Sequence, residues 1–159
     1  MKRIWIILLL CAMLSGCAAA PVYETLGGDI HQAAVTVKEA VVSVPKGAKE
    51  MTMANGTYWI CDSFDLQLQI LAAGDLAATV AALSGLDADN ITVMTSVAGE
   101  MTRYEWVWTA MSEAGQMLCR GLVLDDGAYH YCLTAIGPAE QGESMTSQWN
   151  DIFSGFYAV

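Results

Sequence analysis

Hydrophobic and polar residues alternate along much of the chain, and this period of two predicts β-strands. The clearest stretch is 64–70, where apolar side chains at even positions are separated by aspartate or glutamine. Turn dipeptides such as Asn55-Gly56 separate the alternating stretches. The remaining expected strands cover 34–44, 58–61, 91–97, 103–109, 116–124 and 128–135.

Two stretches change to a helical period. Residues about 75–84 place apolar side chains three and four positions apart, with Asp75 as an N-cap and Gly85 as a C-terminal cap. Residues about 143–154 place their large apolar residues on one helical face and are followed by Gly155. That second apolar face consists of Met145, Trp149, Ile152 and Phe153.

The order of elements indicates an α+β domain. Strands joined by short loops pair antiparallel, and two isolated helices interrupt them. We therefore expect one antiparallel β-sheet of about six to seven strands with two helices. Residues 31–159 form this single domain.

The C-terminal part of the chain resembles the PsbP/Mog1-like group over about 60 residues. In that group a hairpin with a DG-Y-Y strand precedes a loop and a terminal helix that ends in an aromatic segment. The matching residues here are Asp126, Gly127, Tyr129, Tyr131 and the segment 149–156. The resemblance implies a binding or assembly factor and carries no catalytic motif. The chain is also similar to uncharacterised lipoproteins of anaerobic Gram-positive bacteria.

The N-terminus reads as a secretion signal. Lys2 and Arg3 precede an apolar run of 11 residues, 4–14. A helix of that length reaches about 16 Å, too short for a hydrocarbon core of about 30 Å. It has the length of the apolar region of a signal peptide.

The end of the apolar run, Leu14-Ser15-Gly16-Cys17, resembles the bacterial lipobox. The resemblance implies cleavage between Gly16 and Cys17, and acyl chains such as palmitate anchoring Cys17 to membrane lipid. Residues 1–16 would then be the lipoprotein signal peptide, and 17–30 the lipidated N-terminus and tether. The alternative is an ordinary signal peptide cleaved near 18–20. The outer face of a cytoplasmic membrane and a Gram-negative outer membrane both remain open.

The net charge is consistent with an acidic domain that is held at the membrane by its N-terminal anchor. Seven basic and 17 acidic residues give a net charge of −10, and removing Lys2 and Arg3 changes it to −12. This balance excludes a basic nucleic-acid footprint, so no nucleic acid is expected as a partner. Acidic surfaces are repelled by anionic headgroups, so the acyl chains must hold the protein at the membrane.

Three cysteines remain for the domain: Cys61, Cys119 and Cys132. A two- or four-residue loop centred between Asp125 and Asp126 would place Cys119 opposite Cys132, within reach of a disulfide. A three-residue loop would put them on opposite faces of the sheet. The alternative is that all three are small buried hydrophobic residues.

Candidate catalytic and metal-binding residues are few. His31 falls near the tether, and His130 falls in a strand without a nucleophile elbow. Asp87 and Asp89 start like a calcium loop whose later positions do not fit. Met51 and Met53 could offer thioethers to copper(I), but two ligands alone are insufficient. No metal and no cofactor are expected.

Tyr104, Trp106 and Trp108 project from one face of an expected strand. Uncovered, they would form an aromatic binding face for a sugar or peptide. Covered by the helix over 143–154, they would be core. Tyr129 and Tyr131 pose the same question on a neighbouring strand.

The sequence thus predicts a lipid-anchored extracytoplasmic lipoprotein, most simply a non-enzymatic envelope accessory or binding domain. Its partner would be an envelope protein or a small ligand. One alternative is an enzyme with a pocket around His130 or Cys61. Another is a thiol-dependent sensor.

Overall fold

The computed structural model describes residues 36–159. The predicted signal peptide, the cleavage site at Gly16 and Cys17, the tether over 17–30 and His31 lie outside this range. Within 36–159, no helix is both long and apolar enough to cross a membrane.

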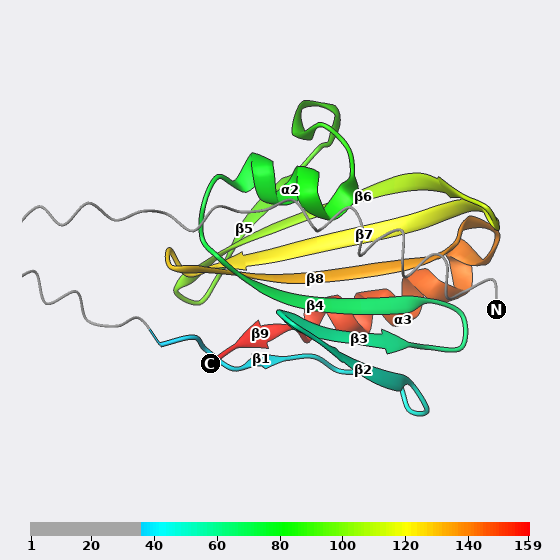
Figure 1. The fold of residues 1–159 in the computed structure, drawn as a ribbon, viewed down its shortest axis with the longest axis horizontal. Coiled ribbons are helices and arrows are strands. Elements are labelled where there is room, and N and C mark those ends of the chain that lie inside the picture. Colours follow the sequence, from blue (N-terminus) through cyan, green and yellow to red (C-terminus); the bar gives the residue numbers. More distant parts are fainter. Residues whose placement is uncertain (1–35) are drawn as a thin grey trace, which may run out of the picture. The chain divides into compact units, whose positions relative to one another are not determined.

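Seven strands form one antiparallel sheet in the order β2-β3-β4-β8-β7-β6-β5 (Figure 1). The predicted α+β class with two helices and six to seven sheet strands is confirmed. The strands are β2 (Lys49–Met53), β3 (Gly56–Ile60), β4 (Asp65–Ala72), β5 (Met94–Ala98), β6 (Met101–Ser112), β7 (Gly115–Asp125) and β8 (Tyr129–Pro138).

Tight hairpins fix the register of most neighbouring strands. Met53 pairs with Gly56, Ala98 with Met101, and Ser112 with Gly115, so two residues connect each pair of strands. β4 instead pairs with β8, which places these two strands at the centre of the sheet although 56 residues separate Ala72 from Tyr129.

In the N-terminal part of the domain, one expected strand is much shorter than predicted and one strand was not predicted. The strand expected over 34–44 contains only β1 (Ala40–Val41) within the described range, and it pairs with β9 (Tyr157–Ala158) in a separate ribbon. β2 was not expected, because its charged start and exposed residues give no apolar alternation. Its register comes from the hairpin with β3, since Tyr58 and Trp59 pair with Met51 and Glu50.

Both helices lie close to their predicted positions. α2 (Leu76–Ser84) begins at Asp75, whose side chain accepts a hydrogen bond from the Ala77 N–H at 3.1 Å. It ends at Gly85, whose φ of 71° suits the left-handed cap that glycine adopts without strain. α3 (Gly142–Ser154) follows the short 3₁₀ turn η2 (Ala139–Gln141). A second 3₁₀ turn, η1 (Ala88–Asn90), follows α2.

The two helices cover opposite faces of the sheet (Figure 1). Alternation along β7 shows this division, because Leu122 and Leu124 join one core and Val123 joins the other. The α3-side core contains Trp59, Cys61, Phe64, Leu66, Leu68, Met101, Leu122, Leu124, Tyr131, Leu133, Ala135, Met145, Trp149, Ile152, Phe153 and Phe156. The α2-side core contains Val80, Trp106, Trp108, Cys119, Val123 and Cys132.

Candidate functional site

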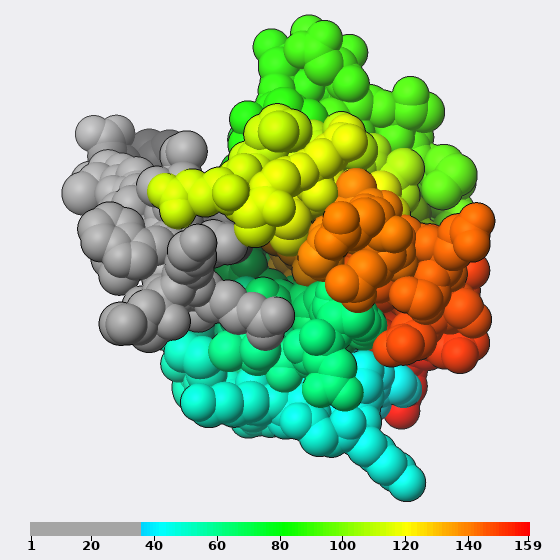
Figure 2. Space-filling view, turned by 90° about the vertical axis from the view of Figure 1, so that its right-hand side faces the viewer, coloured from blue at the N-terminus to red at the C-terminus, as the bar shows by residue number. Residues whose placement is uncertain are grey.

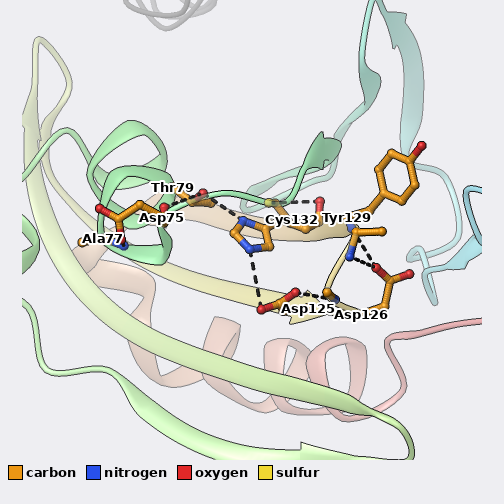
Figure 3. A network of polar contacts seen from close by, with 10 residues as sticks. Asp75, Ala77, Thr79, Asp125, Asp126, Tyr129 and Cys132 are labelled. Atoms are coloured by element: carbon orange, nitrogen blue, oxygen red, sulfur yellow. Dashed lines mark hydrogen bonds and ion pairs between the residues drawn. The ribbon is translucent and has the colours of Figure 1, made fainter. Parts of the chain in front are cut away.

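His130 lies between a hydroxyl and a carboxylate on the α2 side of the sheet (Figure 3). Its Nδ1 is 2.9 Å from Oγ1 of Thr79, which α2 supplies one turn after its N-cap. Its Nε2 is 3.8 Å from Oδ2 of Asp125, the last residue of β7. The order hydroxyl, imidazole, carboxylate is the order of a nucleophilic relay.

Geometry and burial favour a structural role for this array. His130 is 1% exposed and Thr79 is 9% exposed, so the hydroxyl that would attack a substrate is enclosed. The contact to Asp125 is longer than a hydrogen bond, and Oδ1 of Asp125 accepts instead from the Gly127 N–H at 2.8 Å. The Thr79–His130 bond therefore fastens α2 to β8.

The cysteines are free and buried. Cys132 lies opposite Val123, and Cys119 lies opposite Ile136. Both thiols belong to the α2-side core, but the register separates them by four positions along the strands, about 13 Å. The disulfide considered for Cys119 and Cys132 is therefore not supported. The β7–β8 loop is centred between Gly127 and Ala128, later than in either loop considered from the sequence, so the two thiols lie neither opposite each other nor on opposite faces.

Burial also makes the thiols poor nucleophiles. Desolvation raises the pKa of Cys119 and of Cys132 to about 12. Desolvation, with the nearby charges of Asp65 and Asp62, raises the pKa of Cys61 to about 11. A thiol with such a pKa is protonated at neutral pH, whereas catalysis and redox sensing use the thiolate. This agrees with the interpretation of the cysteines as small hydrophobic residues.

The predicted aromatic binding face is largely interior. Trp106 and Trp108 are 1% and 8% exposed, their rings stack at 6.2 Å, and Tyr104 packs against them half-buried. α2 contributes Val80 to this cluster, so the covering helix is α2 and not the helix over 143–154. Gly121 lies opposite Trp106, and a Cβ there would fall 2.4 Å from the indole. A side chain at 121 would therefore displace the ring.

The DG-Y-Y residues form a structural latch. Oδ1 of Asp126 accepts from the backbone N–H groups of Ala128 and Tyr129 at 2.9 and 2.7 Å, and Gly127 takes a φ of 86°. Oδ2 accepts from the Tyr131 hydroxyl at 3.0 Å, and that hydroxyl accepts from the Lys38 N–H at 3.0 Å. The motif closes the β7–β8 hairpin and holds the segment that enters the domain.

These bonds set the charge state of Asp126. Burial alone would raise its pKa, but the N–H groups of Tyr129 and Ala128 and the Tyr131 hydroxyl stabilise the carboxylate and lower the pKa overall. The hydroxyl that donates to this carboxylate is itself buried, and burial raises the pKa of Tyr131.

A charged cluster links β6 and β7 to α3. Glu105 accepts from Arg103 Nε at 2.7 Å and from Arg120 Nη2 at 2.8 Å. Burial acts to raise the pKa of Glu105, and the two guanidinium groups outweigh it and lower the pKa. Arg103 also donates to the Phe153 carbonyl at 2.8 Å, and Arg120 lies 4.5 Å from the centre of the Phe153 ring.

The outer edge of β6 carries two strongly exposed apolar residues. β5 pairs only with Met101–Glu105, so β6 forms the margin of the sheet from 106 to 112 (Figure 1). Val107 and Met111 are 62% and 79% exposed, and Thr109 between them is also exposed. The tip of the β6–β7 hairpin, in yellow, stands at the surface in Figure 2.

The sequence did not identify this edge as a binding surface, because the aromatic residues at even positions of the same strand were the clearer candidates. The exposed residues are the odd ones on the same strand, Val107, Thr109 and Met111. An available signal was the absence of charge: no residue from 106 to 112 is charged. Edge strands usually carry charges or proline that prevent pairing with another chain.

The part of the chain in the structure shows no grouping of three or more His, Cys, Asp or Glu side chains that could hold a metal ion. Asp87 accepts from the Asp89 N–H at 3.2 Å and caps η1, so this pair forms a turn. Met51 and Met53 lie on β2.

Comparisons with known proteins give the fold and no family. No family model matches the sequence, and no curated protein matches it. Cyanobacterial PsbP (CyanoP) from Synechocystis sp. PCC 6803 is similar in structure, with a TM-score of 0.57 and 9% identity, over 86% of this chain and 100% of that chain. LpqN of Mycobacterium tuberculosis, involved in cell envelope biogenesis, has a TM-score of 0.50 and 10% identity, over 76% of this chain and 83% of that chain. The chain therefore has a PsbP-like fold, as its DG-Y-Y segment indicated.

Proposed function

We propose that the protein is a lipid-anchored, extracytoplasmic accessory protein of the cell envelope that binds a protein partner and is not an enzyme. The observation that carries the binding role is the uncharged, unpaired edge of β6 over 106–112. An exposed edge offers a row of backbone donors and acceptors to an added strand. The lipobox-like residues ending at Cys17 supply the anchor.

The similar structures support the location without fixing the partner. One is a PsbP and the other takes part in envelope biogenesis. A binding role also agrees with the interior of the domain. The His130 array and all three thiols are buried, so a molecule that binds would meet the surface of the domain and not these groups.

Anchoring is tested with Cys17→Ser in the full chain. The variant is expected to lose labelling by a palmitate analogue and to move from the membrane fraction to the soluble fraction. Cys11→Ser, within the expected signal peptide, serves as the matched control and is expected to keep both properties. Tight membrane association of Cys17→Ser would contradict the lipid anchor.

Binding at β6 is tested by photocrosslinking in the native envelope. A photoreactive residue at Met111 is expected to give a discrete protein adduct. The same residue at Met51, an exposed methionine on β2 at the opposite sheet edge, is expected to give none. Equal adducts at both positions, or none at Met111, would contradict the proposed edge.

A further inference from the structure

In the second half of β6, the backbone N–H and C=O groups of the odd-numbered residues point away from β7, toward the open edge of the sheet. Ser112 and Gly115 close the two-residue β6–β7 hairpin, and such closing pairs exchange backbone hydrogen bonds. Ser112 and the other even residues therefore bond to β7. The β5–β6 hairpin agrees, because its closing pair, Ala98 and Met101, directs odd residues of β6 toward β5.

After Glu105, the outward N–H and C=O groups of β6 have no neighbouring strand to bond to among residues 36–159. Within residues 36–159, β5 stops pairing at Glu105 and no turn or loop hydrogen bond reaches Val107, Thr109 or Met111. The free edge is seven residues long, about 24 Å. It is long enough for a strand of ordinary length.

The side chains on this edge are complementary to themselves. If a second copy pairs antiparallel with Thr109 opposite Thr109, then Val107 lies opposite Met111 and Met111 opposite Val107. Three hydrogen-bonded pairs result, each exchanging two backbone bonds. Apolar and Thr–Thr pairs directly opposite each other stabilise a sheet.

The other face fits the same register. Trp108 then lies opposite Ala110 of the second copy, and Trp106 opposite Ser112. Each indole meets a small side chain, so the tryptophans keep their places beneath α2. No charged residue falls in the paired stretch itself. Just beyond each end, Glu113 of one copy comes near Glu105 of the other, whose charge Arg103 and Arg120 already balance.

We propose that the edge of β6 pairs with β6 of a second copy of this chain, centred on Thr109, to form one continuous sheet across a twofold dimer. This deepens the proposed function by naming the partner. One strand pair is a small interface, so confinement by the lipid anchor would raise the effective concentration of the second copy. Because net charge repels the copies, the dimer should strengthen as salt is added.

Cysteine crosslinking of the full chain in its native membrane tests the register. Opposed residues of a hydrogen-bonded pair have Cα atoms about 5.5 Å apart, within the range of a disulfide. Thr109→Cys is expected to form an intermolecular disulfide between two copies on mild oxidation. Thr52→Cys is the matched control, an exposed threonine whose backbone points outward on β2 at the opposite edge.

The outcomes separate the occupants of the edge. A dimer of this chain with Thr109→Cys alone supports the proposal. An adduct of Thr109→Cys with a different protein, no adduct, or equal dimers from both variants overturns it. Wild-type protein controls for any thiol left at Cys17. Palmitate labelling of the same membranes reports the anchor separately, so loss of the anchor is distinguished from loss of the dimer.

A second measurement does not rely on disulfide chemistry. Thr109→Lys places two lysines opposite each other in the proposed pairing and should weaken dimerisation by more than about tenfold. Thr52→Lys should leave it unchanged. Sedimentation of the detergent-solubilised full chain at low and high salt measures both. Equal dimerisation of wild type and Thr109→Lys overturns the proposal, and unchanged circular dichroism shows that the variant is folded.

Discussion

The two faces of the sheet are stabilised in different ways. The α3-side core is large and almost wholly apolar, with Tyr131 as the polar exception, and its members come from strands, helix and the aromatic segment near 156. The α2 side has a small core and is flanked by buried polar residues. These polar residues are Gln67, Gln69, Thr79, His130 and Thr134.

The difference indicates that the α3 side supplies most of the folding free energy and that the α2 side is tuned by polar contacts. Apolar burial contributes in proportion to area, whereas a hydrogen bond contributes about 1 kcal/mol net. It also explains why His130, Cys119 and Cys132 lie on the α2 side. Polar groups buried there serve to position α2.

Phe153→Ala is expected to be the most damaging change, because it empties the centre of the α3 side. Phe153 is 0% exposed and also lies under Arg120. We expect a loss of about 3–5 kcal/mol in the free energy of unfolding, measured by urea denaturation. Gln148→Ala, exposed on the same helix, should change it by less than about 0.5 kcal/mol. A loss at Phe153 no larger than at Gln148 would contradict the comparison.

Val80→Ala is the equivalent change on the α2 side. Val80 is 1% exposed and is the buried residue that α2 contributes to its core. Removing two methyl groups' worth of apolar surface should cost about 2 kcal/mol by the same urea measurement. If Val80→Ala cost as much as Phe153→Ala, the two faces would contribute equally and the comparison would fail.

Thr79→Val tests whether the His130 array fastens α2. The valine keeps the shape but leaves His130 Nδ1 without its partner, so about 1–2 kcal/mol should be lost. Thr146→Val is the matched control, because Thr146 makes an i−4 contact to the Gly142 carbonyl on the exposed face of α3. Equal losses in both variants would show that the cost is helical propensity and not the bond to His130.

Asp126→Asn is expected to have the smallest effect, and one that depends on pH. The pKa of Asp126 lies below its ordinary value of 3.8 in the folded protein, so its stabilisation is present above that value and is lost as the pH falls through the folded pKa. The difference in urea unfolding midpoint between Asp126→Asn and wild type should therefore be smaller at pH 3 than at pH 7. A constant difference between them would contradict this.

The sequence predicts the strands and helices whose apolar residues follow a clear period. It does not predict the features that depend on which strands pair and in which register. Trp106 and Trp108 can be assigned to a core from their spacing, but the helix that covers them depends on which face each crossover takes. The loop after β7 lies later in the chain than either loop considered from the sequence, because Asp126 accepts hydrogen bonds from the following N–H groups and so lies inside the loop.

The exposed edge of β6 also could not be predicted from the sequence, because it depends on strand pairing. The alternation of β6 predicts a strand, but only the end of β5 at Glu105 makes its second half a margin of the sheet. The polar array at His130 was also out of reach, since 51 residues separate Thr79 from His130. Both the exposed edge of β6 and the contact between Thr79 and His130 are therefore defined by which elements lie side by side, and not by residue type.

The pairing of β1 with β9 has a mechanical consequence. Glu39 and Val159 exchange backbone hydrogen bonds of 2.7 and 3.0 Å, and the ladder continues to Val41 and Tyr157. A force applied to the chain before Thr36 first meets the bond from the Lys38 N–H to the Tyr131 hydroxyl, and then opens the ribbon from its Glu39 end, one backbone pair at a time. The ribbon would open before β2 carries the force, so the seven-stranded sheet is loaded through β2 only after this ribbon has been lost.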